Sequence, residues 1–307
     1  MVDRTFLKTL VKTTPYVVIG NPIAHSLSPQ IHTQFAAQTQ QDMHYGKLCV
    51  EKEDFFETLD LFFQYGGLGA NITAPFKKMA YEYVGQNFTP EAQISGSVNT
   101  LKKVPKIQDP HHFIQHSIQD THDFSILGHN TDGLGLRSDL EQKNYPITNK
   151  RILILGAGGA TQGIIPALLE QSPGCLEIYN RTPETLEALL KKFPFCSSYK
   201  NQDTQLNTQL KTPTISHARL SYDLIINTLP SKAFQNMDVS NLSLIPIPAH
   251  TYAYDLNYDL HHKTPFLEKC VSLSQHQADG LGMLIAQAAE SFYFWRGRYP
   301  LSNPRIK

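Results

Sequence analysis

Short apolar runs alternate with helical patterns along the first part of the chain. Tyr16–Gly20 is an apolar run closed by glycine and is typical of a strand. Ser28 and Pro29 then predict a helix start, with Ser28 as N-cap and Pro29 at the first helical position. Residues 53–65 carry Phe and Leu at helical spacing, and a Gly-Gly pair ends this second predicted helix. The alternation predicts an α/β layer structure.

The same alternation returns more strongly after residue 150. Arg151–Leu155 has the pattern of a buried strand, and an apolar helical run follows the glycines that close it. Further strands are predicted at Cys175–Tyr179 and Tyr222–Asn227. Successive β and α units of this kind specify a doubly wound parallel sheet with right-handed crossovers.

Two polar stretches interrupt these patterns. Residues 104–125 are polar and weakly periodic, which predicts an extended loop or hairpin arm. Residues 197–216 are polar and rich in Gln, Asn and Thr, which predicts a loop on the surface. The first stretch holds four histidines: His111, His112, His116 and His122. No Cys accompanies them and no H-x-x-x-H pair stands on a predicted helix, which favours a solvated arm, and no metal is expected in the protein.

Composition narrows the class of protein. The chain has 307 residues, 41% of them hydrophobic and 18% charged, which is ordinary for about two folded domains. Basic and acidic residues number 27 each, so no global field favours nucleic acid or an anionic membrane as partner. Four scattered cysteines indicate neither a zinc site nor a disulfide framework. Without a signal or membrane-span pattern, we expect a cytoplasmic protein, a monomer or a homodimer.

A glycine-rich turn follows the strand at 151–155. Such a turn between a strand and a helix lets backbone N–H groups and the helix N-terminus meet a pyrophosphate. Gly156 permits the tight turn, and Gly158 lets a ligand approach the backbone. Thr161 stands at the third position, so the common dinucleotide fingerprint is not matched literally, and the strand and helix on either side carry the interpretation. Tight packing alone is the alternative explanation.

The end of the next strand indicates which dinucleotide is bound. An acid there suits the ribose 2′-hydroxyl of NAD, whereas an arginine suits the 2′-phosphate of NADP. Here the strand is followed by Asn180-Arg181-Thr182, which favours NADP, although a surface arginine is the plainer alternative. The residues expected to contact the cofactor in this region are Gly156, Gly158, Gly159, Ala160, Asn180, Arg181 and Thr182.

Four polar clusters precede the glycine turn, each interpreted as a strand-to-helix junction. They span residues 20–29, 69–77, 96–100 and 128–133. Such junctions converge on one edge of an α/β layer, where ligands bind. Their hydroxyls, amides, lysine and aspartate suit a polyhydroxylated acid, although each cluster alone also fits helix caps and turns.

Lys77 and Asp132 are the charged candidates in these clusters. Lys77 is expected in the first turn after Pro75, near the positive end of a helix dipole, which disfavours an extra cation there. This placement suits a group that exchanges a proton, and Asp132 is expected to hold and polarise it.

These motifs, in this order, resemble those of shikimate dehydrogenases over nearly the whole chain. Three more stretches share the resemblance: residues 254–258, 263–267 and 279–288. The resemblance implies two α/β domains, one binding substrate and one Rossmann-like and binding NADP. It implies a substrate domain at residues 1–130 completed by a helix at 279–307, and a cofactor domain at 131–278. The reaction it implies is the reversible reduction of 3-dehydroshikimate to shikimate in aromatic biosynthesis.

The resemblance also implies a role for each site residue. Lys77 and Asp132 would form the catalytic pair, while Gly280 and Met283 would border the nicotinamide. The substrate carboxylate would be bound by Ser26, Ser28, Thr73 and Tyr258. The ring hydroxyls would be bound by Asn71, Asn99 and Gln287.

Some features depart from the family pattern or leave alternatives open. Thr185 stands where many members carry a second basic residue, residues 227–231 replace a small-residue loop, and the 104–125 arm is longer than usual. A quinate or dual-specificity dehydrogenase would have the same fold and chemistry. A non-catalytic regulatory protein is a second alternative, which the presence of both Lys77 and Asp132 disfavours. A bifunctional folate dehydrogenase shares the layout, but the serine pair suits a carboxylate better than a pterin.

Overall fold

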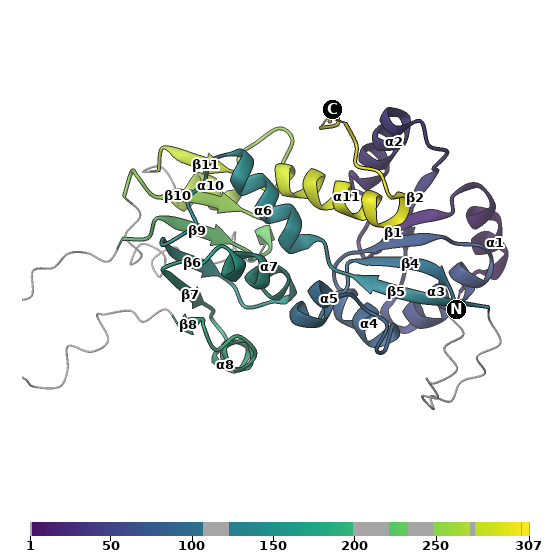
Figure 1. The fold of residues 1–307 in the computed structure, drawn as a ribbon, viewed down its shortest axis with the longest axis horizontal. Helices are drawn as coiled ribbons and strands as arrows, with labels where there is room; N and C mark the ends of the chain where they lie inside the picture. The colour runs from purple at the N-terminus through teal and green to yellow at the C-terminus, as the bar shows by residue number, and fades with distance from the viewer. Residues whose placement is uncertain are drawn as a thin grey trace, which may run out of the picture. The chain divides into compact units, whose positions relative to one another are not determined.

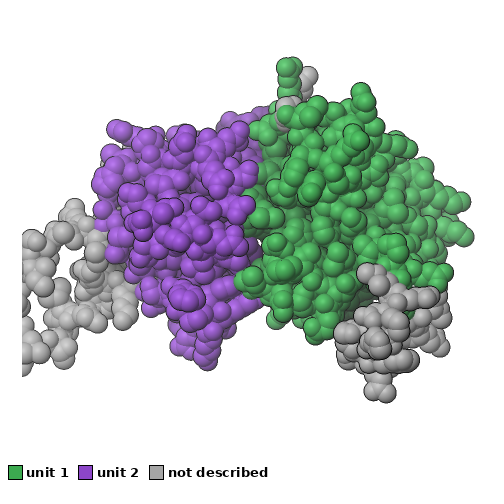
Figure 2. Space-filling view, in the orientation of Figure 1, with its two compact units in different colours: residues 1–135, 285–307 green, residues 136–284 purple. Residues whose placement is uncertain are grey.

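The computed structural model describes residues 2–106, 123–198, 221–232, 248–270, 274–301 and 303–306. The chain divides into two compact units, shown in Figures 1 and 2: unit 1 is residues 1–135 with 285–307, and unit 2 is residues 136–284. The divisions lie a few residues beyond the expected 130 and 279. One reason is that Asp132 bonds to Lys77 of unit 1, and another is that Met283 packs in the core of unit 2.

Unit 1 is built on a five-stranded mixed sheet with the order β2-β1-β3-β4-β5. Its strands are β1 (Tyr16–Gly20), β2 (Tyr45–Cys49), β3 (Gly69–Ile72), β4 (Thr100–Pro105) and β5 (Phe124–His129). β1 pairs in parallel with β2 and β3, whereas β4 is antiparallel to β3 and β5. The carboxyl ends of β1, β3 and β5 therefore share one edge with the amino end of β4.

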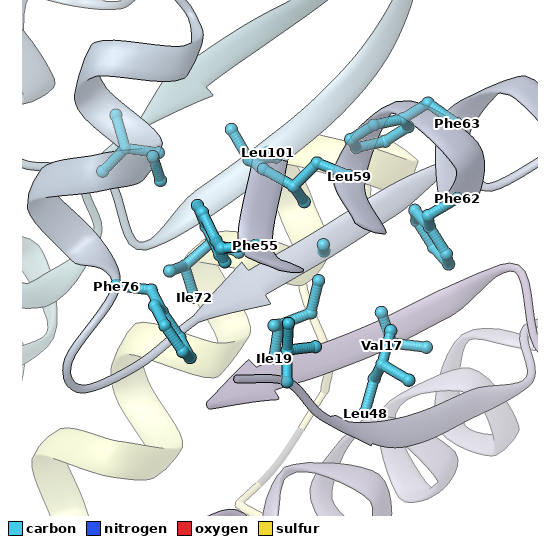
Figure 3. Close-up of a cluster of buried hydrophobic side chains, with 14 of the residues drawn as sticks. Val17, Ile19, Leu48, Phe55, Leu59, Phe62, Phe63, Ile72, Phe76 and Leu101 are labelled. Atoms are coloured by element: carbon cyan, nitrogen blue, oxygen red, sulfur yellow. The ribbon is translucent and has the colours of Figure 1, made fainter. Parts of the chain in front are cut away.

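Helices cover both faces of this sheet. They are α1 (Arg4–Thr13), α2 (Ser28–Thr39), a 3-10 turn (Lys52–Asp54), α3 (Phe55–Gln64), α4 (Lys77–Tyr83), α5 (Pro90–Ser95) and α11 (Leu281–Arg296). Apolar side chains of α3, such as Phe55 and Leu59, pack with Val17 and Ile19 of β1 (Figure 3). Alternate strand residues point to opposite faces, and Tyr16 on the other face packs against the ring of Trp295 in α11.

Unit 2 is a six-stranded parallel sheet with the order β11-β10-β9-β6-β7-β8. Its elements are α6 (Asp132–Gln142), β6 (Arg151–Leu155), α7 (Gly159–Glu170), β7 (Cys175–Tyr179), α8 (Pro183–Lys192), β8 (Ser197–Ser198), β9 (Leu224–Asn227), β10 (Tyr252–Asp255), α10 (Pro265–Cys270) and β11 (His276–Ala278). Apolar residues of β6, such as Ile152 and Ile154, are fully buried in its core. The expected Rossmann-like parallel sheet is thereby confirmed.

Most predicted elements are present, with local corrections. Ser28 is not the N-cap of α2: the helix already begins at Ser28, Leu27 precedes it, and Leu27 makes no side-chain cap. The Ser28 hydroxyl instead meets that of Ser26. The second helix begins at Phe55, after the 3-10 turn.

The two polar stretches are described only in part. The ends of the 104–125 arm extend β4 and β5 as an antiparallel pair, while residues 107–122, which include its four histidines, lie outside the described residues. The loop predicted at 197–216 begins with the short strand β8, and its part from 199 onward also lies outside them. No helix in the described part of the chain is long and apolar enough to cross a membrane.

Candidate active site

The four polar clusters of unit 1 meet at one edge of its sheet. The cluster at 96–100 corrects the expectation, because it joins α5 to β4 and is therefore a helix-to-strand junction. β4 runs antiparallel to its neighbours, so its amino end reaches the same edge as the carboxyl ends of β3 and β5. Thr100 pairs with Asn71 on one side and with His129 on the other. The expected convergence is thus a consequence of strand direction.

Lys77 and Asp132 form an ion pair at this edge. Lys77 is the first residue of α4, and its Nζ donates to Asp132 Oδ2 at 2.6 Å. The side chain of Asp132 is 8% exposed and that of Lys77 is 24% exposed, so the lysine is the partner that solvent or a ligand reaches more easily. The Asp132 backbone N–H donates to Asn130 Oδ1, which fixes the start of α6.

Asn99 holds the other oxygen of Asp132. Its Oδ1 accepts from the backbone N–H of Thr131 at 2.9 Å, and this assigns the opposite end of the amide as the donor. The Asn99 Nδ2 donates to Asp132 Oδ1 at 2.8 Å. Asp132 therefore accepts on both oxygens, as an ionised carboxylate does.

Asn71 lies in β3 and is bonded on all sides within unit 1. Its Oδ1 accepts from the Tyr45 hydroxyl at 2.7 Å, and burial raises the pKa of that tyrosine well above its ordinary value. The tyrosine is consequently a neutral donor. The Asn71 Nδ2 faces the backbone carbonyl of Asn99 at 3.2 Å and Ser291 Oγ at 3.0 Å.

The serine pair and Thr73 lie at the same edge. Ser26 Oγ donates to Ser28 Oγ at 3.2 Å, and Ser28 is 6% exposed. The backbone N–H of Thr73 donates to Ile19 O, which ties the residues after β3 to β1. Gly20 faces Thr73 so closely that a Cβ there would overlap the threonine methyl. Adjacent hydroxyls of this kind suit the two oxygens of a carboxylate.

Gln287 and Tyr258 come from distant parts of the sequence. Gln287 lies in the unit 1 part of α11, with its Oε1 3.3 Å from the Thr131 hydroxyl. Tyr258 lies in unit 2, in the loop after β10. Burial raises the pKa of Tyr258, so it offers a neutral hydroxyl.

The glycine turn of unit 2 has the expected form. Gly156 adopts φ +109, a conformation that favours glycine, and a Cβ there would lie 2.5 Å from Thr228 Oγ1. Gly158 precedes the first residue of α7, and a Cβ at Gly158 or Gly159 would meet no atom within 4 Å. Space is thus open in front of a helix N-terminus, as a pyrophosphate requires.

The Asn180–Thr182 segment lies beside this turn. Asn180 Oδ1 accepts from the backbone N–H of Ala157 at 3.2 Å, and its Nδ2 donates to Thr182 O at 2.9 Å. These bonds hold the end of β7 against the turn, with Arg181 exposed between them. A bidentate cation is therefore available next to the expected pyrophosphate site.

Gly280 and Met283 lie at the start of α11. The backbone N–H of Gly280 donates to Asn257 O at 2.9 Å, and a Cβ at Gly280 would overlap the carbonyl of Leu256. Met283 is 8% exposed and packs in the core of unit 2. Close backbone packing at Gly280 fixes where the helix begins.

Comparison with known proteins identifies the family. Residues 18–101 match the shikimate dehydrogenase substrate binding domain, residues 139–236 match shikimate/quinate 5-dehydrogenase, and residues 280–301 match the shikimate 5'-dehydrogenase C-terminal domain. A shikimate dehydrogenase (NADP(+)) of Herminiimonas arsenicoxydans is 40% identical over 289 residues, which is 94% of each chain. The chain belongs to the shikimate dehydrogenase family.

Solved structures agree with this membership. Shikimate dehydrogenase from Aquifex aeolicus aligns with a TM-score of 0.73 and 25% identity, over 94% of each chain. Shikimate 5-dehydrogenase from Thermus thermophilus, solved in complex with NADP(H) and shikimate, aligns with a TM-score of 0.69 and 25% identity. That alignment covers 93% of this chain and 94% of the Thermus chain.

Within this shikimate dehydrogenase chain, the expected residues divide between the units. Unit 1 brings together the catalytic candidates Lys77 and Asp132 with Asn71, Asn99 and Gln287, and it also carries the serine pair and Thr73. Unit 2 carries the glycine turn, the Asn180–Thr182 segment, Tyr258, Gly280 and Met283. The roles of the individual residues stay predictions.

Sequence reasoning missed several residues of the unit 1 site. They are Tyr45, Thr100, Asn130, Thr131 and Ser291, each bonded to an expected site residue. Thr100, Asn130 and Thr131 lie inside the expected clusters at 96–100 and 128–133 and were within reach of motif reasoning. Ser291 is one polar position in an otherwise ordinary helical pattern, so the sequence carries no signal for it.

Proposed function

We propose that this protein catalyses the reversible, NADP-dependent interconversion of 3-dehydroshikimate and shikimate in aromatic amino acid biosynthesis. The observation that carries the proposal is the part-buried ion pair of Lys77 and Asp132, whose atoms lie 2.6 Å apart. Asn99 donates to the same aspartate, and the pair lies at the edge of the unit 1 sheet that also carries Ser26 and Ser28. Its relatives are named NADP-dependent shikimate dehydrogenases.

The residues of unit 2 fit the cofactor. The open space before Gly158 and Gly159 and the positive φ of Gly156 suit the pyrophosphate, and exposed Arg181 suits the 2′-phosphate. When bound, NADP supplies or accepts the hydride. The protein's own part is to bind the dinucleotide, orient the substrate and manage the proton.

Lys77 is the group that handles the proton. In the reducing direction its ammonium donates a proton to the substrate's carbonyl oxygen, which becomes the hydroxyl of shikimate. In the oxidising direction its amine takes that proton back from the hydroxyl. Asp132 accepts from Lys77 at 2.6 Å and keeps Nζ in one place throughout the exchange. Ser26, Ser28, Thr73 and Tyr258 supply hydroxyls for the substrate carboxylate.

Quinate is the second candidate substrate. One of the family models that match this chain is described as shikimate/quinate 5-dehydrogenase. Kinetics on both acids with NADP⁺ separate the two. We expect shikimate to have the higher kcat/KM, and a higher value for quinate would reverse the assignment.

The experiment that tests the proposal is the oxidation of shikimate with NADP⁺ at alkaline pH, followed at the nicotinamide absorbance. Wild-type protein turns over, and Lys77→Ala lowers kcat by about two to four orders of magnitude, because the proton has no positioned acceptor. Lys78→Ala is the matched control, since Lys78 is the exposed next residue of α4 and keeps full activity. Absence of wild-type turnover would refute the function, while an active Lys77→Ala variant would refute only its role.

We also propose that the enzyme acts in the cytoplasm as a monomer or a homodimer. The support is the balanced charge of 27 basic and 27 acidic residues, which gives no global attraction to an anionic membrane. Light scattering coupled to gel filtration gives the oligomeric state, and a mass above that of two chains would contradict it.

A further inference from the structure

A fully buried hydroxyl of α11 lies under the unit 1 site. Ser291 is 0% exposed, and its Oγ lies within hydrogen-bond distance of four polar groups. These are Asn71 Nδ2 at 3.0 Å, Thr100 Oγ1 at 2.8 Å, Thr131 Oγ1 at 3.2 Å and the carbonyl of Gln287 at 3.0 Å. One serine therefore joins residues of β3, β4, α11 and the residue that precedes α6.

The donors and acceptors around Ser291 have few possible arrangements. The Asn99 carbonyl only accepts, so the Asn71 Nδ2 that lies 3.2 Å away must face it, and the same Nδ2 then donates to Ser291 Oγ. Thr100 donates its proton to Asn99 Oδ1 at 2.8 Å, so in its pair with Ser291 the proton comes from Ser291, whose one O–H is shared between Thr100 Oγ1 and the carbonyl of Gln287. Ser291 thus accepts from the Asn71 amide and contacts the Thr100 hydroxyl that holds the Asn99 amide.

Hydrogen bonds link these side chains to the Lys77–Asp132 ion pair through Asn99. Asn99 is held at its Oδ1 by Thr100 and by Thr131, and its Nδ2 donates to Asp132 Oδ1 at 2.8 Å. The residues that lead from Ser291 to Asp132 are each at most 6% exposed, so water does not replace a bond that is lost; they are Asn71, Thr100, Thr131 and Asn99.

We propose that Ser291 is a positioning residue for shikimate: it acts through Asn71, Thr100 and Thr131 to orient the substrate-binding amides and the Asn99–Asp132 contact. The inference rests on the proposed function and goes beyond it, since Ser291 itself touches no expected ligand group. The sequence gives Ser291 no motif, and its role follows from the hydroxyl cluster alone.

Kinetics of Ser291→Ala test the proposal. Loss of one buried hydrogen-bonding partner lowers kcat/KM for shikimate about tenfold. KM for NADP⁺ stays within about twofold of wild type, because the expected cofactor residues belong to unit 2. Thr58→Val is the matched control, because Thr58 is also a buried helical hydroxyl bonded to the carbonyl four residues earlier, at 2.7 Å, and it is remote from the cluster.

A double-mutant cycle with Thr100→Val separates positioning from simple destabilisation. If Ser291 acts through the cluster, the double variant loses no more activity than the worse single variant. Additive losses, or an unchanged kcat/KM in Ser291→Ala, overturn the proposal. If Ser291→Ala does not fold, Ser291→Cys replaces it, with an expected loss of about threefold from its weaker hydrogen bonds. Inactive wild-type protein would instead refute the proposed function, so the two failures are distinct.

Discussion

At the residue scale, the site depends on amides whose two ends are fixed by their neighbours. Asn99 accepts a backbone N–H at one end and donates to Asp132 at the other, and Asn180 links the glycine turn to Thr182 in the same manner. An amide bonded at both ends is preorganised, so little ordering remains for the moment of binding. Charged side chains then need to move little: Lys77 already meets Asp132, and Arg181 is already exposed.

Arg181 carries the residue-scale prediction. Arg181→Ala raises KM for NADP⁺ about 10-fold or more, because a charge-assisted bond to the 2′-phosphate is lost, and it leaves KM for NAD⁺ unchanged. The measurement is steady-state kinetics with each dinucleotide at saturating shikimate. Lys191→Ala, which removes another exposed cation of unit 2, changes neither constant. Equal changes in KM for NADP⁺ and NAD⁺ would show that Arg181 does not bind the 2′-phosphate.

At the element scale, the first turn of α11 packs closely against α6 because a glycine stands at the contact. Gly282 lies against the Asp139 carboxylate so closely that a Cβ would overlap it. Asp139 is 1% exposed, is paired with Lys143 and accepts from the Tyr254 hydroxyl at 2.6 Å. Because these bonds hold the carboxylate, it has no easy way to move aside.

Replacement of Gly282 tests this packing. Gly282→Ala lowers the free energy of unfolding by about 1–3 kcal/mol, the usual cost of overpacking a filled site. Urea unfolding followed by circular dichroism measures it. Gly159→Ala is the control: a Cβ there meets nothing within 4 Å, so stability is kept while the affinity for NADP⁺ falls. A Gly282→Ala variant as stable as wild type would show that α6 and α11 separate easily.

At the scale of the whole molecule, helix α11 contributes side chains to the interior of both units. Met283 of α11 packs in the core of unit 2, whereas Phe292 and Trp295 of the same helix join the aromatic cluster of unit 1. Trp295 is the one tryptophan of the sequence, so its fluorescence reports the unfolding of unit 1. His32 lies in this cluster, stacked on Tyr45 at 4.3 Å.

His32 makes the stability of unit 1 depend on pH. It is 0% exposed, neither ring nitrogen has a hydrogen-bond partner among the described residues, and burial lowers its pKa to about 3 from 6.5. The unfolded chain binds the proton more tightly, so stability is full above pH 6.5 and falls as pH drops from 6.5 towards 3. The slope is up to about 1.4 kcal/mol per pH unit.

The check is urea unfolding followed by Trp295 fluorescence at several pH values between 6.5 and 4.5. His32→Phe keeps an aromatic ring in the cluster and removes the titrating group, so its slope should be smaller than that of wild type by up to about 1.4 kcal/mol per pH unit. Equal slopes in the two proteins would mean that His32 is not the group responsible.

The strands and the charged pair were predictable because their signals are local. A buried parallel strand such as Arg151–Leu155 reads as a continuous apolar run, and Gly156 marks the turn after it by its residue type. Lys77 and Asp132 stand in dense polar clusters, and such clusters indicate a ligand-binding site from the sequence alone. The start of α2 was misjudged by one residue, since the helix begins at Ser28 itself and the local pattern fixes a helix end only to within a residue or two.

Local pattern was enough to predict the two α/β units, the glycine turn and the residue types of the site, because periodicity and motif spacing are properties of neighbouring residues. Tertiary structure alone decided that β4 runs antiparallel, which brings Asn99 to the edge where Asn71 and Asp132 lie. It also decided that Ser291, 191 residues from Thr100, closes the hydroxyl cluster beneath them. Such contacts join residues far apart along the chain, and only packing of the sheet against α11 fixes them.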